Sequence, residues 1–179
     1  MIALENIIND LKLGKRKAQA VLYEHYAPVL LSLCMRYSKS KAEAEDILQE
    51  GFIKIFEKVG DLQKTNSLVP WMKRIMVNTA INSYHKNLKH YYHEDIDELQ
   101  IDEQNIDEQA DYQSGISPEL VIKSIQELPE GYQIVLNMYV FEGFTHKEIA
   151  EELNISVNTS KTQLFKARKK LKEKFKMAH

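Results

Sequence analysis

The apolar residues of this chain recur three and four positions apart along most of its length, and alternation of apolar and polar residues is nowhere sustained. Spacing of three and four places side chains on one face of a helix, whereas alternation would indicate strands. The pattern predicts a short amphipathic segment, with Ile7, Ile8 and Leu11, that ends at Gly14. It then predicts helices over about 17–37, 41–58, 71–90, 118–128, 129–141 and 145–153, and a last helix that begins after Ser156. The predicted fold class is therefore all-α.

Short motifs mark where two of these helices begin. Thr145 with Glu148, and Ser40 with Glu43, have the spacing of a capping box. In this motif the hydroxyl accepts a hydrogen bond from a backbone N–H inside the helix, and the carboxylate accepts one from the backbone N–H of the capping residue. Both pairs therefore predict a helix start.

The four prolines refine the boundaries. Pro118, after Ser117, and Pro129 stand where new helices start, and Pro70 lies in the first turn of another, where its missing N–H costs nothing. Pro28 falls inside the 17–37 helix, so the sequence predicts a kink or a break there.

The last two predicted helices are separated by Asn154 and Ile155, which predicts the tight turn of a helix-turn-helix. Beyond Ile155, lysine and arginine far outnumber the single acid Glu173, so a polyanion is the natural partner. Short polar side chains at the start of the second helix suit base edges in a major groove, and the cations farther along suit phosphates. The alternative is a solvated basic helix on the outside of a bundle.

Two earlier helices also have distinct polar faces. The 41–58 helix carries an acidic and amide-bearing face that a basic partner could bind, although a solvated face would look the same. The 71–90 helix carries cations and amides without a carboxylate, which suits a nucleic acid backbone or an ordinary exposed helix. The residues of the second face are Arg74, Asn78, Asn82, Lys86 and Lys89.

Charged residues are distributed unevenly along the chain. The net charge is only -2, but residues 91–116 are rich in Asp and Glu and contain neither Lys nor Arg. Such a composition predicts a disordered segment. The sequence therefore predicts a helical domain at 1–90, an acidic flexible linker at 91–116 and a second helical domain at 117–179.

Composition limits the remaining possibilities. No stretch approaches the roughly 20 apolar residues that cross a bilayer, no signal peptide is evident, and the single Cys34 lies in an apolar run, so a cytoplasmic protein without membrane insertion is expected. No phosphate-binding glycine loop or paired nucleophile and base is present, so neither enzyme activity nor a cofactor is predicted. His85, His90 and His93 lie near carboxylates, but solvated histidines explain them better than a metal site.

Three segments in order resemble the extracytoplasmic-function group of bacterial sigma factors, in which the conserved regions two and four are joined by a linker. They are AEAEDILQEGFIKIF at 42–56, PWMKRIMVNTAINSYHK at 70–86 and LPEGYQIVLNMYVFEGFTHKEIAEELNISVNTSKTQLFKARKKL at 128–171. The resemblance implies a subunit that binds core RNA polymerase, through its clamp coiled coil and flap, and directs promoter recognition and transcription initiation. It also implies that the acidic linker threads a basic channel of the polymerase.

The resemblance further assigns residues to three contacts. Polymerase binding falls on Asp46, Gln49 and Glu50, with Phe52 packing beside them. Single-stranded minus-ten DNA falls on the Gly60–Ser67 loop and the helix after it, through Asp61, Lys64, Asn66, Arg74, Asn78, Asn82 and Lys86. Duplex minus-thirty-five DNA falls on Asn158, Thr159, Lys161, Thr162, Gln163, Lys166 and Arg168.

This chain departs from the family pattern at several of these positions. Asn82 stands where many members have Asp, Asn158 where Gly often opens the recognition helix, and Gln163 and Phe165 replace commoner basic and small residues. These differences bear on the promoter sequence and leave the function unchanged. Members of the group are often held inactive by an anti-sigma factor, which is a further implied partner.

The main alternative is a freestanding helix-turn-helix regulator that binds duplex DNA without polymerase. It explains residues 145–176 and leaves the first helical domain and the acidic linker without a purpose.

Overall fold

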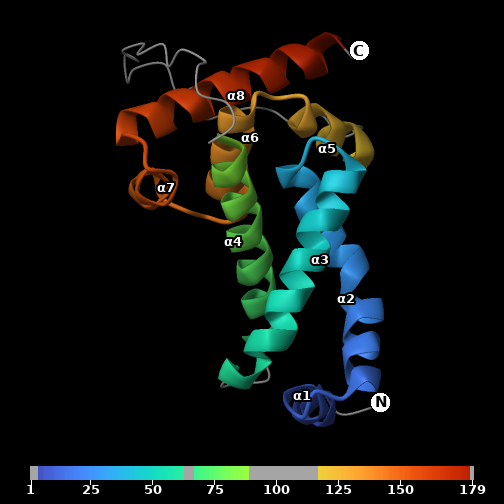
Figure 1. The fold of residues 1–179 in the computed structure, drawn as a ribbon. Coiled ribbons are helices and arrows are strands. Elements are labelled where there is room, and N and C mark those ends of the chain that lie inside the picture. The colour runs from blue at the N-terminus through green and yellow to red at the C-terminus, as the bar shows by residue number, and fades with distance from the viewer. Residues whose placement is uncertain (1–3, 63–66, 89–116, 178–179) are drawn as a thin grey trace. The chain divides into compact units, whose positions relative to one another are not determined.

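The computed structural model describes residues 4–62, 67–88 and 117–177 and divides the chain into two compact units, 1–86 and 87–179 (Figure 1). All regular elements within those described ranges are helical, which confirms the all-α fold class. None of the helices there is long and apolar enough to cross a membrane. The predicted linker at 91–116 lies outside the described residues.

The first unit contains four α-helices and one short turn of 3₁₀ helix in its described part. Figure 1 shows α2 and α3 side by side, with α1 against the start of α2. The elements are α1 (Leu4–Lys12), α2 (Arg16–Tyr37), α3 (Lys41–Lys58), η1 (Val59–Asp61) and α4 (Leu68–Leu88). Their ends match the prediction closely, except that α4 begins at Leu68, before Pro70.

The core of this unit forms from the apolar stripes that the helical spacing predicts. Burial of each large aliphatic side chain contributes about 1.5–3 kcal/mol, so these stripes supply most of the stability of the unit. The largest fully buried side chains are Leu22 and Leu30 of α2, Ile55 of α3, and Leu68, Met72 and Met76 of α4. Cys34 is also buried, and burial raises the pKa of its thiol to about 12, so it behaves as a small apolar residue.

The sequence predicted a kink or a break at Pro28. Helix α2 continues through this residue, so the break is wrong and the kink stays a prediction. Proline lacks an N–H and removes one intrahelical hydrogen bond, yet the helix runs from Arg16 to Tyr37 without interruption. The residues on either side are held by the burial of Leu22 and Leu30 in the core, which explains why local disruption does not end the helix.

The second unit contains α5 (Pro118–Gln126), α6 (Glu130–Leu136), the π-helical turn η4 (Asn137–Phe141), α7 (His146–Leu153) and α8 (Val157–Met177). The single helix predicted over 129–141 is therefore only partly right. Asn137, which is buried, donates its side-chain N–H to the carbonyl of Gln133 at 2.9 Å. Its own carbonyl accepts from the N–H of Glu142 five residues later at 3.2 Å, which is the hydrogen-bond spacing of a π turn.

The helix starts show how closely local motifs fix the backbone. The capping box of Thr145 and Glu148 is present as predicted. At the start of α3 only half of the predicted box forms, because the Ser40 hydroxyl accepts from Glu43 N–H but the Glu43 carboxylate accepts from the backbone N–H of Lys39 at 2.6 Å. Asn154 ends α7 in the left-handed conformation, with φ of 54°.

Candidate protein and nucleic-acid interfaces

The outer face of α3 presents an acidic and amide surface in the first unit. Asp46 and Gln49 are exposed, one turn apart, as the sequence predicted. Ile53, four residues after Gln49, is 57% exposed on the same face. Sequence analysis missed Ile53, although its position between Gln49 and Glu57 on the polar stripe was the available signal. A single exposed apolar side chain is common on protein surfaces, so Ile53 is a candidate contact only because it lies beside Asp46 and Gln49.

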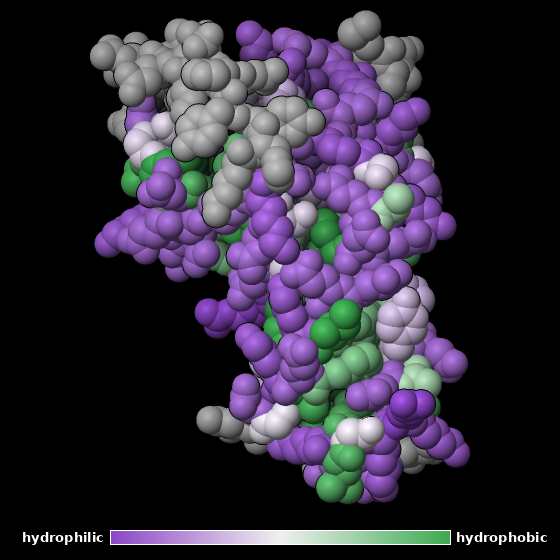
Figure 2. All heavy atoms as spheres, viewed as in Figure 1, coloured by the Kyte–Doolittle hydropathy of each residue, from purple (hydrophilic) through white to green (hydrophobic). Residues whose placement is uncertain are grey.

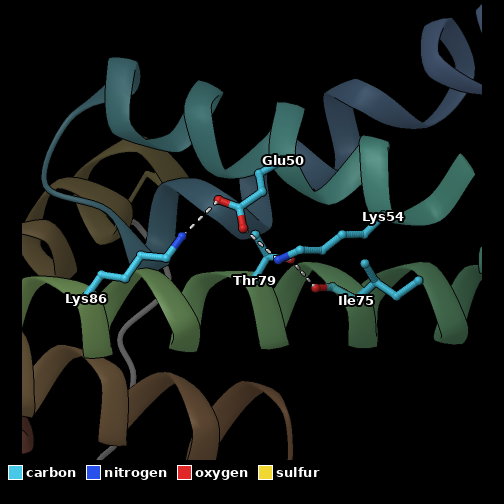
Figure 3. A network of polar contacts seen from close by, with 5 residues as sticks. All are labelled: Glu50, Lys54, Ile75, Thr79 and Lys86. Carbon is cyan, nitrogen blue, oxygen red and sulfur yellow. Dashed lines mark hydrogen bonds and ion pairs between the residues drawn. The ribbon is translucent and has the colours of Figure 1, made fainter. Parts of the chain in front are cut away.

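Glu50 does not share this outward position, because its carboxylate is turned toward α4. One oxygen accepts from Lys54 Nζ at 2.7 Å, and the other lies 3.8 Å from Lys86 Nζ (Figure 3). Lys54 Nζ also donates to the Thr79 hydroxyl at 3.2 Å, and that hydroxyl donates to the Ile75 carbonyl at 2.8 Å. These contacts tie α3 to α4.

The contacts with Lys54 and Lys86 lower the pKa of Glu50. The hydrogen bond from Lys54, followed by the charges of Lys54 and Lys86, holds the pKa of the Glu50 carboxyl below its ordinary value despite some desolvation. Glu50 therefore stays ionised at neutral pH. Because its charge is already compensated by two lysines of the same unit, it is less available to an outside partner than Asp46 is.

Phe52 lies beneath the outer face of α3. It is 2% exposed, and its ring lies 4.7 Å from that of Tyr23 and 5.8 Å from that of Phe56, measured between centroids. This position agrees with the packing role in its prediction and places it out of direct reach of a partner. Tyr23, which is 40% exposed, extends the same aromatic cluster to the surface.

The outer face of α4 carries the predicted line of cations and amides. Asp61, at the end of η1, is exposed as well, whereas Lys64 and Asn66 lie outside the described residues. The predicted residues on α4 are spaced by four, so they follow one another along a single side of the helix. The exposed residues of this line are Arg74, Asn78, Asn82 and Lys86.

In the second unit, polar and aromatic contacts hold the helix-turn-helix together. His146, the first residue of α7, places Nδ1 at 2.9 Å from the Ser160 hydroxyl of α8. Its ring stacks on Tyr139 of η4 with centroids 4.5 Å apart, and the Arg168 guanidinium lies 5.7 Å from the Tyr139 centroid. Burial, and then the charges of Lys161 and Arg168, lower the pKa of His146. The imidazole is therefore neutral at neutral pH.

Part of the predicted minus-thirty-five set lies on the exposed side of α8. Asn158, Lys161 and Arg168 are exposed, and Lys166 is half-buried. The Thr159 hydroxyl lies 2.8 Å from the Ser156 hydroxyl, which also accepts from Thr159 N–H and so caps the start of the helix. Figure 2 shows a mainly hydrophilic surface over the C-terminal part of α8.

The structure places two of the predicted residues differently. Thr162 is 7% exposed, so its hydroxyl would have to become accessible before it could contact DNA. The Gln163 carboxamide packs against α6, where an added Cβ on Gly131 would lie 2.9 Å from Gln163 Nε2, and Gln163 Oε1 is buried without a hydrogen-bond partner among the described residues. The position of Gln163 therefore favours a packing role.

Sequence analysis did not assign two apolar residues at the surface of α8. Val157 and Phe165 are each 42% exposed. Phe165 lies one turn after Lys161 and one turn before Arg168, so a phenyl ring sits within the cationic side of the helix.

Two family models match this chain. Sigma-70 region 2 matches residues 22–89, and Sigma-70, region 4 matches residues 119–171. The curated relatives include an ECF RNA polymerase sigma-E factor of Haemophilus influenzae, 27% identical over 94% of this chain and 93% of its own length. They also include the RNA polymerase sigma-H factor of Pseudomonas aeruginosa, 26% identical over 92% and 89%.

A solved structure has a similar fold. It is the sigma factor RpoE of Bartonella quintana, in complex with the anti-sigma factor NepR, with a TM-score of 0.50 at 19% identity over 89% of this chain and 98% of that one.

The two matches and their order along the chain define a sigma factor of the sigma-70 family, and the chain belongs to that family. Within it, the similarity to sigma-E and sigma-H factors places the chain in the extracytoplasmic-function group. It is therefore a noncatalytic subunit that directs RNA polymerase to promoters and initiates transcription, and that binds core polymerase and promoter DNA.

Proposed function

We propose that the two units divide the work of promoter recognition, with domain 1–90 binding polymerase and the minus-ten element, and domain 117–179 binding the minus-thirty-five element. The observation that supports this division is the contrast between two faces of the first unit. One is acidic on α3, around Asp46, and the other is cationic and amide-bearing on α4, around Arg74. A protein partner and a nucleic acid require such opposite faces.

The polymerase contact on α3 is centred on Asp46 and Gln49, with Ile53 as an apolar anchor between them and Glu57. Charged groups steer association and fix its register, while a desolvated apolar side chain adds much of the affinity. Glu50 acts mainly by holding Lys54 and Lys86, which keeps α3 and α4 in register. Clamp contact and DNA contact are thereby linked through one carboxylate.

The minus-ten contact follows the line on α4. Arg74 and Lys86 suit phosphates, and Asn78 and Asn82 suit base edges. Extruding a base costs a few kcal/mol, which stacking and backbone contacts must offset. Asp61, Lys64 and Asn66 complete the assignment, in the Gly60–Ser67 segment that precedes α4.

The minus-thirty-five contact uses the exposed side of α8. Asn158 and Thr159 lie at the start of the helix, where an HTH recognition helix meets base edges, and Lys161, Lys166 and Arg168 provide cations farther along. Thr162 joins this set only when its hydroxyl is exposed. Gln163 contributes by packing on α6 and supports the helix from behind.

An anti-sigma factor is a further proposed partner. Support comes from the group to which the chain belongs and from the Bartonella quintana relative in fold, whose structure contains one. Such a partner would act in the cytoplasm, where core polymerase and DNA are found, and would cover the α3 face or the DNA faces.

The test is run-off transcription with bacterial core RNA polymerase on sheared genomic DNA, with start sites mapped in the presence and absence of this protein. New starts that share two upstream motifs support the proposal. Asp46→Arg should abolish them, whereas Lys58→Glu, an exposed change on the same helix, should leave most of them. Absence of new starts, together with salt-sensitive retardation of duplex DNA by the protein alone, would favour a freestanding regulator.

A further inference from the structure

Helix α1 is a structured element that the recognised regions do not account for. The region 2 match begins at residue 22, after α1 has ended at Lys12. Yet α1 is firmly packed, because Ile8 is 4% exposed and Leu11 is 2% exposed. Its apolar face lies against α2 and η1. The helix therefore has a defined place in the first unit, and η1 is the part of the unit that leads to the minus-ten segment.

A specific polar contact extends this packing. Lys12, the last residue of α1, donates from Nζ to the carbonyl oxygen of Leu62 at 3.1 Å, in partly buried surroundings. Leu62 is the last described residue before 63–66 and is 5% exposed. Its own N–H donates to the Val59 carbonyl at 3.2 Å. Both polar backbone groups of Leu62 are therefore satisfied, the carbonyl by a cation fifty residues earlier in the chain.

This anchoring sets the direction of the neighbouring side chain. Asp61 is exposed while Leu62 is buried beneath α1, so adjacent residues point to opposite sides. On the far side of the segment, Leu68 is 1% exposed in the core. Leu62, the last described residue before 63–66, is buried, and its carbonyl is held by Lys12 of α1.

The connection from α1 to α2 limits how far α1 can shift. Gly14 has φ of 68°, a conformation that glycine adopts without strain. Lys15 forms an ion pair with Asp10 at 2.7 Å and donates its backbone N–H to the Asp10 carbonyl at 3.0 Å. These contacts lie within the turn and connect the end of α1, where Lys12 lies, to the start of α2.

We propose that α1 is a positioning element for minus-ten recognition and that Lys12 is its positioning residue. By holding the carbonyl of Leu62, Lys12 fixes the end of η1 and therefore which way the neighbouring Asp61 faces. This role rests on the proposed assignment of the Gly60–Ser67 segment to the minus-ten element. Lys12 itself does not contact DNA.

The test compares holoenzymes that carry Lys12→Met, Lys12→Arg or Lys17→Met. Met keeps most of the length of the side chain and removes the donor, and Arg keeps a donor. Lys17 is an exposed lysine in the first turn of α2 and serves as the matched control. The first measurement is the rate of promoter opening at one of the mapped start sites, monitored through the permanganate reactivity of unpaired thymines. The second is the ratio of holoenzyme affinities for the single-stranded minus-ten sequence and for its single-base substitutions.

We expect Lys12→Met to slow opening and to reduce the base preference by about tenfold, the lower end of the usual effect of losing one hydrogen bond to a charged donor. Lys12→Arg should keep most of the opening rate and of the base preference, and Lys17→Met should change neither quantity. The affinity ratio is measured on one preparation, so a lower folded fraction cancels out. An unchanged ratio in Lys12→Met, or equal losses in Lys12→Met and Lys12→Arg, would overturn the role of Lys12.

A further variant separates this inference from the function on which it rests. Asn78→Ala alters a proposed minus-ten contact directly, without touching α1. If Asn78→Ala reduces the base preference and Lys12→Met does not, only the positioning role fails. If neither variant changes the preference, the minus-ten assignment fails and the role of α1 with it.

Discussion

Each unit has one helical glycine on which a long side chain from another helix rests, and the two contacts differ in kind. In the first unit, a Cβ added to Gly51 of α3 would lie 2.2 Å from Met76 Sδ. In the second, a Cβ added to Gly131 of α6 would lie 2.9 Å from Gln163 Nε2. Met76 is fully buried, whereas Gln163 is half-buried at the edge of α8.

The two contacts differ in how far the side chain that lies against the glycine can move. The Met76 side chain is fully buried, so it can lie against the backbone of α3 only because Gly51 has no side chain. Gln163 is half-buried, so its carboxamide can turn toward solvent more easily, although its Oε1 is buried in the present position. The contact of Met76 with Gly51 is therefore expected to tolerate a new side chain less well than the contact of Gln163 with Gly131.

The largest effect is expected for Gly51→Leu. Its side chain would overlap Met76 and force α3 away from α4, which should lower the free energy of unfolding of the first unit by about 3 kcal/mol. Thermal unfolding, with hydrogen exchange to locate the change in α3 and α4, measures it. Gly60→Leu is the matched control, because nothing lies within 4 Å of a Cβ there. Equal losses in the two variants would contradict the tight contact.

A pH effect should distinguish the second unit. The folded pKa of His146 is lowered from its ordinary 6.5, so the unfolded chain takes up the proton first. The contribution to stability is present above about pH 6.5 and is lost as the pH falls from there through the folded pKa. His146→Gln should remove that part of the pH dependence.

Hydrogen exchange of α7 and α8 at several pH values is the measurement for His146→Gln. His25→Gln, in the first unit, is the control and should leave the dependence of the second unit unchanged. If the second unit of His146→Gln still loses the same stability as the pH falls, another group causes that loss.

A smaller effect is expected for Lys54→Met, which removes the donor that links Glu50 to Thr79. The pair is partly exposed, so the loss at neutral pH should be about 1 kcal/mol. The lowered pKa of Glu50 gives stability above the ordinary carboxyl value of 4.5 that disappears as the pH falls through the folded value. Lys54→Met should therefore flatten the acid limb of a stability profile, and Lys58→Met, an exposed lysine on the same helix, should not.

The smallest effect, and of opposite sign, is expected for Gly131→Ala. Alanine favours a helix over glycine by up to about 1 kcal/mol, and Gln163 can turn aside to admit one methyl group. Stability of the second unit should rise slightly, as seen by chemical denaturation. Gly51→Ala is the matched variant in the first unit and should destabilise it, because its methyl group would overlap Met76 Sδ. If Gly131→Ala loses as much stability as Gly51→Ala, Gln163 is as confined as Met76 and the contrast between the units does not hold.

The features predicted from sequence were those that neighbouring residues determine. The Thr145–Glu148 box, the turn at Asn154 and the apolar stripes depend on spacing within one element, and all are present. The π turn was not predicted because it depends on Asn137, whose buried amide bonds to the preceding turn. Nothing in the apolar spacing of 129–141 distinguishes that turn from continuous α-helix.

Whether a candidate site residue is free to contact a binding partner depends on its neighbours from other helices, which the sequence does not show. Glu50 and Asp46 belong to one motif, yet only Glu50 faces two lysines, one of them from α4. Gln163 and Lys161 are two residues apart in one helix, yet Gln163 packs on Gly131 of α6. Periodicity indicates which side of a helix is polar, but only tertiary packing determines which polar groups remain available to a partner.

The two buried leucines on either side of residues 63–67 have a consequence for protein design. Leu62 is 5% exposed and Leu68 is 1% exposed, so a substitution of either one alters the core of the first unit. A chimera that exchanges residues 63–67 between sigma factors should therefore keep both leucines. The change in start-site preference of such a chimera would measure how much Lys64 and Asn66 contribute to promoter selection, separately from the residues of α4.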